Sequence, residues 1–130
     1  MGLTGSREDY LEVICEICKK EKVARVKDIA LRMGVSLPSV NYALTMLEKA
    51  GLIKHKKYGF IELTKEGNKT GKAISKKHQI IKEFLMNILK VNEKTAERDA
   101  CKMEHVLSKE TLNRMDFFLK TKGGENSYPY

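Results

Sequence analysis

The spacing of apolar residues along the amino-terminal part of the chain predicts three helices. In residues 6–20, apolar side chains recur every three or four positions, and the segment begins with a serine that is a suitable N-cap. The segment VKDIALRMG predicts a short second helix ending at Gly34, because glycine readily adopts the left-handed conformation of a helix terminus. Ser36 is expected to cap a third helix that carries Pro38 in its first turn and ends at Gly51.

The segment that follows, LIKHKKYGFIELT, predicts a basic β-hairpin. It has two short strands, residues 52–56 and 60–63, joined at Tyr58-Gly59. A helix, a glycine-containing turn and a second helix form a helix-turn-helix motif. A hairpin placed directly after that motif is typical of the wing of a winged helix-turn-helix domain.

The remainder of the chain predicts further helices. A long helix is expected from residue 65 to about 90, although Gly67 and Gly71 each weaken it by about 1 kcal/mol relative to alanine. Asn92 is expected to cap a helix over residues 93–107, and Ser108 to cap the last one. The fold class is therefore mostly α, with a winged helix-turn-helix followed by a helical domain.

Length and composition add limits to this organisation. The 130 residues are 42% hydrophobic and 32% charged, which is ordinary for a soluble globular protein, and no apolar run reaches the roughly 20 residues of a membrane span. Three cysteines without a secretory signal favour a reducing cytoplasm, so we expect a cytoplasmic protein with no membrane partner. The expected parts are a DNA-binding domain in residues 1–71, a helical domain in 72–122 and a disordered tail in 123–130.

The net charge of +8 is concentrated in one segment. Residues 54–77 contain eight lysines and two glutamates, a net charge of +6, whereas residues 78–107 are balanced. Such a patch is typical of a surface that binds phosphates, although a solvated lysine-rich helix gives the same count.

The third predicted helix is the one expected to enter the major groove, with its first residues near the base edges. Its exposed side chains are short and polar, and none is an arginine that could bind guanine through two hydrogen bonds, so shape and apolar contact are expected to contribute. A purely structural interpretation makes Ser36 only a cap and packs Tyr42 inside. The predicted DNA contacts are Ser36, Pro38, Ser39, Asn41, Tyr42 and Thr45 at the bases, and Lys27, Lys54, Lys56 and Lys57 at the phosphates.

The stretch ERDACKMEHVLS raises the possibility of a metal site. As a helix it places Cys101, Glu104 and His105 on one face, where sulfur, oxygen and nitrogen donors could bind a divalent transition metal. A cysteine on an amphipathic helix is more often a core residue, and a Glu–His pair more often lies on the surface. Further donors are present at Asp9, Glu12 and His78.

Cys15 and Cys18 form a CxxC motif inside the first predicted helix. Zinc ribbons need a second CxxC, and thioredoxin-like sites need a preceding strand, neither of which the sequence predicts. Packing is therefore the favoured interpretation of both cysteines.

The segments EDYLEVI, ARVKDIA, PSV, KKHQIIKEFL and DACKMEHVLS resemble the diphtheria-toxin-repressor and manganese-transport-regulator family, over nearly the whole chain to about Thr121. The resemblance implies a homodimeric repressor that binds double-stranded operator DNA when loaded with Fe(II) or Mn(II), at one or two ions per subunit. It assigns metal binding and dimerisation to the helical second domain. No SH3-like third domain is expected at this length. The implied metal ligands are Asp9, Glu12, His78, Cys101, Glu104 and His105.

The ligand set mixes two branches of that family. Asp9 and Glu12 resemble the manganese-responsive branch, whereas Cys101 resembles the iron-responsive branch. The positions that correspond to further donors of an ancillary site hold Lys82 and Glu97. Because a thiolate is softer than Mn(II) prefers, Fe(II) is slightly favoured, and Co(II), Ni(II) and Zn(II) are expected to substitute in vitro.

The working hypothesis is that the ion ties the first helix to the helical domain and so sets the spacing of the two reading helices in a dimer. Two rival interpretations are a winged-helix regulator that needs no metal, and a metallohydrolase with Glu104 as base. The second rival lacks a signature such as HExxH, so neither enzymatic activity nor a small-molecule substrate is expected. The predicted dimer interface, part of which must instead fill the core, comprises Ile81, Phe84, Leu85, Ile88, Leu112, Met115, Phe118 and Leu119.

Overall fold

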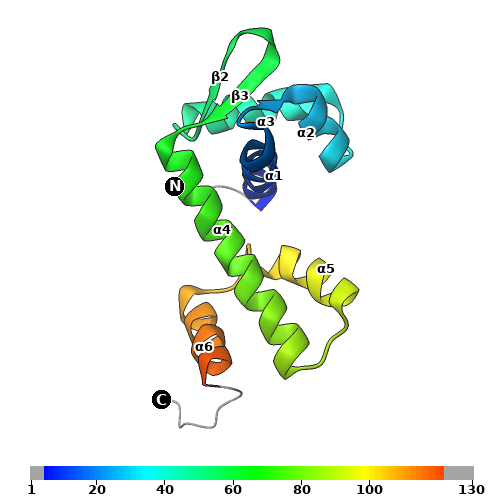
Figure 1. Cartoon of the computed structure of the whole chain (residues 1–130), viewed down its shortest axis with the longest axis vertical. Helices are drawn as coiled ribbons and strands as arrows, with labels where there is room; N and C mark the ends of the chain where they lie inside the picture. The colour runs from blue at the N-terminus through cyan, green and yellow to red at the C-terminus, as the bar shows by residue number, and fades with distance from the viewer. Residues whose placement is uncertain (1–4, 122–130) are drawn as a thin grey trace. The chain divides into compact units, whose positions relative to one another are not determined.

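The computed structural model describes residues 5–121 and divides into two compact units, Met1–Ile74 and Ser75–Tyr130 (Figure 1). The boundary lies within one helix, α4 (Lys65–Glu83). None of the helices in residues 5–121 combines the length and the apolar character needed to cross a bilayer. The predicted disordered tail lies outside the described residues.

The amino-terminal unit is a winged helix-turn-helix, as predicted. A hairpin of β2 and β3 follows α3, and the short strand β1 pairs with the other edge of β3, so the antiparallel sheet has the order β1-β3-β2 (Figure 1). Strand β1 was not predicted, because two residues are too few to show a period. The elements are α1 (Gly5–Glu21), β1 (Ala24–Arg25), α2 (Val26–Met33), α3 (Leu37–Lys49), β2 (Ile53–His55), the 3-10 turn η1 (Lys57–Gly59) and β3 (Phe60–Leu63).

Local signals explain the ends of α2 and α3. Gly34 ends α2 in the left-handed region, with φ of 65°. The Ser36 Oγ accepts the backbone N–H of Ser39 at 3.3 Å, which confirms it as the N-cap of α3. The predicted N-cap at Ser6 is wrong, because α1 begins at Gly5 and Ser6 already lies inside it.

The core of this unit is formed by the apolar faces of its helices and the inner face of its sheet. Leu11 and Ile14 of α1 pack with buried residues of α2, α3 and the sheet. Cys15 belongs to the same core, which confirms packing as its structural role. A Cβ atom built on Gly71 would lie 2.1 Å from the Cys15 Sγ, so the glycine is what allows α4 to approach α1 this closely.

The carboxy-terminal unit contains the second part of α4, the π-helical turn η2 (Phe84–Ile88), α5 (Glu93–Met103) and α6 (Lys109–Lys120). Asn92 Oδ1 accepts the Thr95 N–H at 2.9 Å and Ser108 Oγ accepts the Thr111 N–H at 3.1 Å, so both predicted caps are confirmed. The helix predicted over 93–107 ends earlier, at Met103, and the predicted long helix finishes with a π turn.

Three residues of the predicted dimer interface instead fill the core of this unit. Ile81, Leu85 and Leu112 are buried together with Ala96 and Ala100. They therefore pack within the subunit, because almost none of their surface is left for a partner. The other five predicted interface residues are partly buried and keep exposed surface: Phe84, Ile88, Met115, Phe118 and Leu119.

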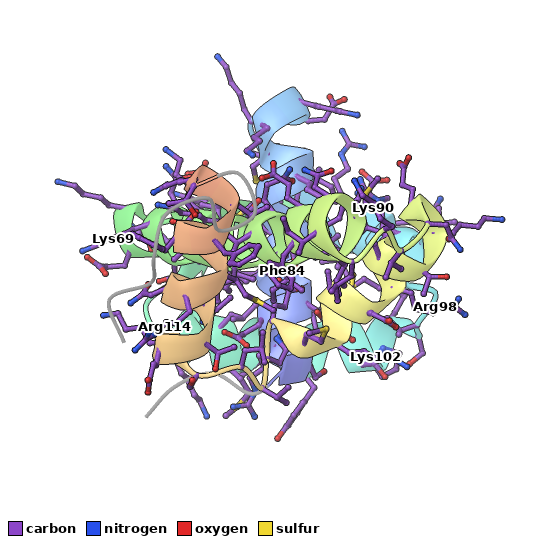
Figure 2. The ribbon with its side chains drawn as sticks, turned by 90° about the horizontal axis from the view of Figure 1, so that it is seen from below. Lys69, Phe84, Lys90, Arg98, Lys102 and Arg114 are labelled. Atoms are coloured by element: carbon purple, nitrogen blue, oxygen red, sulfur yellow. The ribbon has the colours of Figure 1, made fainter. Side chains whose placement is uncertain are left out.

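Aromatic packing joins η2 to α6. Figure 2 shows Arg98 and Lys102 of α5 pointing away from the unit, and Phe84, which is partly buried, nearer its middle. The rings of Phe84 and Phe118 meet edge to face with centroids 6.0 Å apart. This geometry favours attraction between aromatic rings and holds α6 against the π turn.

Candidate metal centre and DNA-binding face

His78 on α4 lies beside three donor residues of α5 and its C-terminus. Its Nε2 atom is 2.6 Å from Oε2 of Glu97, and its Nδ1 atom is 3.5 Å from Oε1 of Glu104. The Cys101 thiol donates a hydrogen bond to Oε2 of Glu97 at 3.6 Å. Because residues 97, 101 and 104 are spaced at four and three positions, they project from one face of the helical segment toward the imidazole.

Glu104 is the one charged side chain among the described residues that is fully buried, with 2% of its surface exposed. A carboxylate out of water is costly unless a cation or hydrogen bonds compensate for it. The neighbouring His78 can supply that compensation when protonated, and a divalent cation held between the two would supply more. Carboxylate, imidazole and thiolate donors are also the ligands that Fe(II), Co(II) and Zn(II) accept. The residues present therefore fit a divalent transition metal.

Lys82 stands next to the same group of donors. Its Nζ lies 3.0 Å from Glu97 and 3.9 Å from Glu93, and the hydrogen bond with Glu97 raises the pKa of Lys82. Burial by itself would raise the pKa of Glu97. The hydrogen bond from Lys82 and the proximity of His78 outweigh burial and lower that pKa below its usual range. Glu97 is thus held as a carboxylate at neutral pH.

The predicted ligands are distributed over both units. His78, Cys101 and Glu104 come together in the carboxy-terminal unit, and His105 directly follows Glu104 in the chain. Asp9 and Glu12 lie at i and i+3 on α1 in the amino-terminal unit. Glu97 was not predicted as a ligand, although its spacing of four from Cys101 on a helix was the available signal.

The predicted DNA contacts are all exposed side chains of the amino-terminal unit. Tyr42 is 65% exposed, so the interpretation that packs it in the core is wrong. The Thr45 hydroxyl donates to the Asn41 backbone carbonyl at 2.9 Å, and the side chain is exposed. Lys54 lies on β2, and Lys56 and Lys57 lie at the tip of the wing.

A hollow beside the start of α3 is lined in part by Arg7, which was not among the predicted DNA contacts. It has a volume of about 560 Å³ and lies between α1 and α3. Arg7, in the first turn of α1, is one of the residues that line this hollow. Because Arg7 is an isolated arginine far from α3 in the sequence, no sequence pattern indicates that it lies beside that helix. The lining residues are Ser6, Arg7, Tyr10, Pro38, Ser39, Tyr42 and Ala43.

Comparison with known proteins gives a consistent assignment for both units. Residues 2–61 match the family model described as "Iron dependent repressor, N-terminal DNA binding domain". Residues 64–122 match the model described as "Iron dependent repressor, metal binding and dimerisation domain".

Individual relatives extend the similarity along most of the chain. The transcriptional regulator MntR of Escherichia coli O157:H7 is 37% identical over 118 residues, which are 91% of this chain and 76% of that protein. The HTH-type transcriptional regulator MntR of Bacillus subtilis (strain 168) is 34% identical over 112 residues, 86% of this chain and 78% of that protein. The solved structure of the manganese regulator SloR superimposes with a TM-score of 0.79 at 32% identity over 92% of this chain. This chain spans about half the length of that structure, covering 55% of it.

Proposed function

This chain belongs to the family of iron-dependent repressors, which are metal-dependent transcriptional regulators and not enzymes, and we propose that it binds operator DNA as a homodimer when a divalent metal ion is bound. The observation that carries the proposal is the convergence of His78, Cys101 and Glu104 in the unit that matches a metal-binding and dimerisation domain. A winged helix-turn-helix in the other unit provides the DNA-binding surface.

The proposed ion is Fe(II) or Mn(II), at one or two per subunit. Relatives of this chain include the manganese regulator SloR. The thiolate of Cys101 favours Fe(II) slightly, since Mn(II) prefers oxygen and nitrogen donors. Co(II), Ni(II) and Zn(II) are expected to bind in vitro. The proposed ligands are Asp9, Glu12, His78, Cys101, Glu104 and His105.

These residues would couple metal binding to DNA binding through α1. Asp9 and Glu12 would hold the ion from the amino-terminal unit, while the other ligands hold it from the carboxy-terminal unit. A bound divalent cation supplies the positive charge that allows three carboxylates to lie together without mutual repulsion. Joining α1 to the dimerising unit restricts where each α3 helix can lie. In the dimer that binds DNA, the two α3 helices must fit successive major grooves, about 34 Å apart. The ion favours DNA binding if it binds this arrangement more tightly than the others that the dimer can adopt.

On the DNA, α3 would supply the contacts to bases and the wing the contacts to phosphates. Four exposed lysines flank α3 in the sequence: Lys27 precedes it, and Lys54, Lys56 and Lys57 follow it. Each lysine that neutralises a phosphate releases counterions, so binding should weaken as the salt concentration rises. The dimer contact is proposed at the partly exposed apolar side chains of the carboxy-terminal unit, which are Phe84, Ile88, Met115, Phe118 and Leu119.

The test is fluorescence anisotropy with a labelled duplex from the protein's own upstream region, titrated with Mn(II) or anaerobic Fe(II) and then with chelator. Binding should require the metal and be lost on chelation. His105→Ala should abolish the response to metal while circular dichroism shows the helices intact. His55→Ala, the same substitution at an exposed histidine of the other unit, should retain the ratio of affinities with and without metal. Equal binding by metal-stripped and metal-loaded protein would instead establish a metal-independent winged-helix regulator.

A further inference from the structure

The first part of α4 carries a row of lysines on its outward face. Lys65, Lys69 and Lys72 are exposed, and their spacings of four and three positions place them on one face of the helix. The opposite face is buried, and it includes Gly71 and Ile74. Because an α-helix rises about 1.5 Å per residue, the row is about 10 Å long.

No acidic side chain neutralises this row in the part of the chain that the structure describes. Residues 67–82 contain neither aspartate nor glutamate. None of the three lysines forms an ion pair within residues 5–121, whereas Lys82 and Lys120 do. Like charges three or four positions apart disfavour a helix, so the row works against the stability of α4. A helix face that is merely solvated usually carries charges of both signs, so this arrangement favours a polyanionic partner.

A hollow beside the start of α4 adds two lysines to the row. It has a volume of about 590 Å³ and is lined by Lys65 together with Lys19 of α1 and Lys22, which follows α1 closely. Both added lysines are exposed. The five side chains together form the lateral basic surface, which comprises Lys19, Lys22, Lys65, Lys69 and Lys72.

The lateral basic surface is continuous with the wing. A second hollow, of about 500 Å³, is lined by Lys56 and Lys57, two of the predicted phosphate contacts. Val23 and Glu62 line both hollows, so the two are adjacent. Glu62 is the one acidic residue that lines either hollow among the described residues, and it lies opposite Lys54 in the pairing of β2 with β3. A polyanion bound at the wing therefore has a further positively charged surface beside it.

We propose that the lateral basic surface binds the phosphate backbone of the DNA that flanks the operator, beyond the point where the duplex passes the wing. Phosphates of one strand follow one another about every 3.4 Å along the duplex axis, so a row about 10 Å long can meet about three of them. Bending the duplex around the wing costs elastic energy, which the added phosphate contacts offset. An anionic membrane is a poorer match, because the face of α4 opposite the lysines is buried and offers no apolar anchor. The inference rests on the proposed function, since it extends the same complex with DNA.

The test compares two duplexes by fluorescence anisotropy in excess Mn(II). The short duplex is the upstream region trimmed to the shortest length that retains binding, and the long one carries a further helical turn, about 10 base pairs, at each end. The wild type should bind the long duplex about tenfold to a hundredfold more tightly at low salt, with a steeper dependence on salt concentration. A variant with Lys65→Gln, Lys69→Gln and Lys72→Gln should bind the short duplex as the wild type does and lose that advantage. Glutamine has nearly the helix propensity of lysine, so α4 is retained.

A matched control removes the same charge from the carboxy-terminal unit. The variant with Lys94→Gln, Lys102→Gln and Lys109→Gln changes three exposed lysines and should keep the full advantage of the long duplex. The control also accounts for the additional non-specific binding sites that any longer duplex offers.

The outcomes separate this inference from the proposed function. Equal affinity of the wild type for both duplexes, or an undiminished advantage in the α4 variant, overturns the inference. Equal weakening on both duplexes would place these lysines at the operator itself and also overturns it. If the α4 variant instead loses binding to vesicles of phosphatidylglycerol and phosphatidylcholine while it keeps the advantage, the surface binds a membrane and the inference is wrong. If the short duplex binds equally with and without metal, the proposed function fails, while the comparison of the two duplexes still decides the inference.

Discussion

Replacing Gly67 with alanine should destabilise the amino-terminal unit, although helix propensity alone predicts a gain of up to about 1 kcal/mol. A Cβ atom at this position would lie 1.8 Å from the carbonyl oxygen of Leu52 and 2.8 Å from its carbonyl carbon. That carbonyl is fixed, because it accepts the N–H of Thr64 at 3.0 Å, while the Leu52 N–H donates to Leu47 at 3.1 Å. The obstacle is backbone that joins α3 to the sheet, so no side-chain rotation can relieve the overlap.

The magnitude follows from the movement that is required. Contact between carbon and a carbonyl oxygen needs at least about 3.2 Å, so the start of α4 would have to move by more than 1 Å away from Leu52. Overpacking of this kind costs about 1–3 kcal/mol, and loss of the Leu52–Thr64 hydrogen bond about 1 kcal/mol more. After subtracting the propensity gain, we expect the free energy of unfolding to fall by about 2 kcal/mol.

Urea unfolding followed by tyrosine fluorescence is a suitable assay, because the chain has no tryptophan and the tyrosines of the described residues all lie in this unit, at Tyr10, Tyr42 and Tyr58. Gly71→Ala is the matched comparison, since its Cβ would meet the Cys15 side chain rather than backbone. Combining Gly71→Ala with Cys15→Ala should recover part of the lost stability, whereas no such partner exists for Gly67. A Gly67→Ala protein at least as stable as the wild type would refute the reasoning.

Three further predictions concern single side chains. Ser36→Ala removes the acceptor of the Ser39 N–H and should lower the free energy of unfolding by about 1 kcal/mol, measured in urea. Lys57→Ala should weaken binding to all DNA sequences alike and, because a homodimer loses one lysine in each subunit, reduce the slope of log affinity against log salt by about two. Burial raises the pKa of Cys15 from 9.0 to about 11, so at pH 8 iodoacetamide should modify exposed Cys101 first, and Cys15 only as the pH approaches 11, as followed by mass spectrometry.

The first two of these predictions have control variants elsewhere in the chain, and the third has a result that would contradict it. Ser75→Ala changes an exposed serine inside α4 and should leave stability within about 0.5 kcal/mol of wild type. Lys94→Ala removes an exposed lysine of the carboxy-terminal unit and should not alter the salt slope. Faster alkylation of Cys15 than of Cys101 at pH 8 would mean that the α1 core opens more readily than its burial implies.

The winged helix and its caps could be predicted because they depend on residues close together in the sequence. Ser36, Asn92 and Ser108 each satisfy an N–H three positions later, so a single helical turn contains the whole signal. Cys101 and Glu104 could be selected for the same reason, since a helical period of 3.6 places them on one face. The resemblance to the family could also be seen in the sequence, because it rests on short segments such as EDYLEVI and DACKMEHVLS.

By itself, then, the sequence determined the order of the helices, the N-caps of three of them and the donors carried on each helix face, because these are properties of short-range periodicity and hydrogen bonding. Only the tertiary structure placed Glu97 against His78 on a different helix, and buried Ile81 in the core rather than at a partner. It also showed that Gly67, which the sequence marked only as a residue that weakens a helix, lies where the backbone of Leu52 approaches α4 closely. The physical reason is that these features depend on which segments pack together, and the free energy of packing is distributed over many distant contacts that no local pattern encodes.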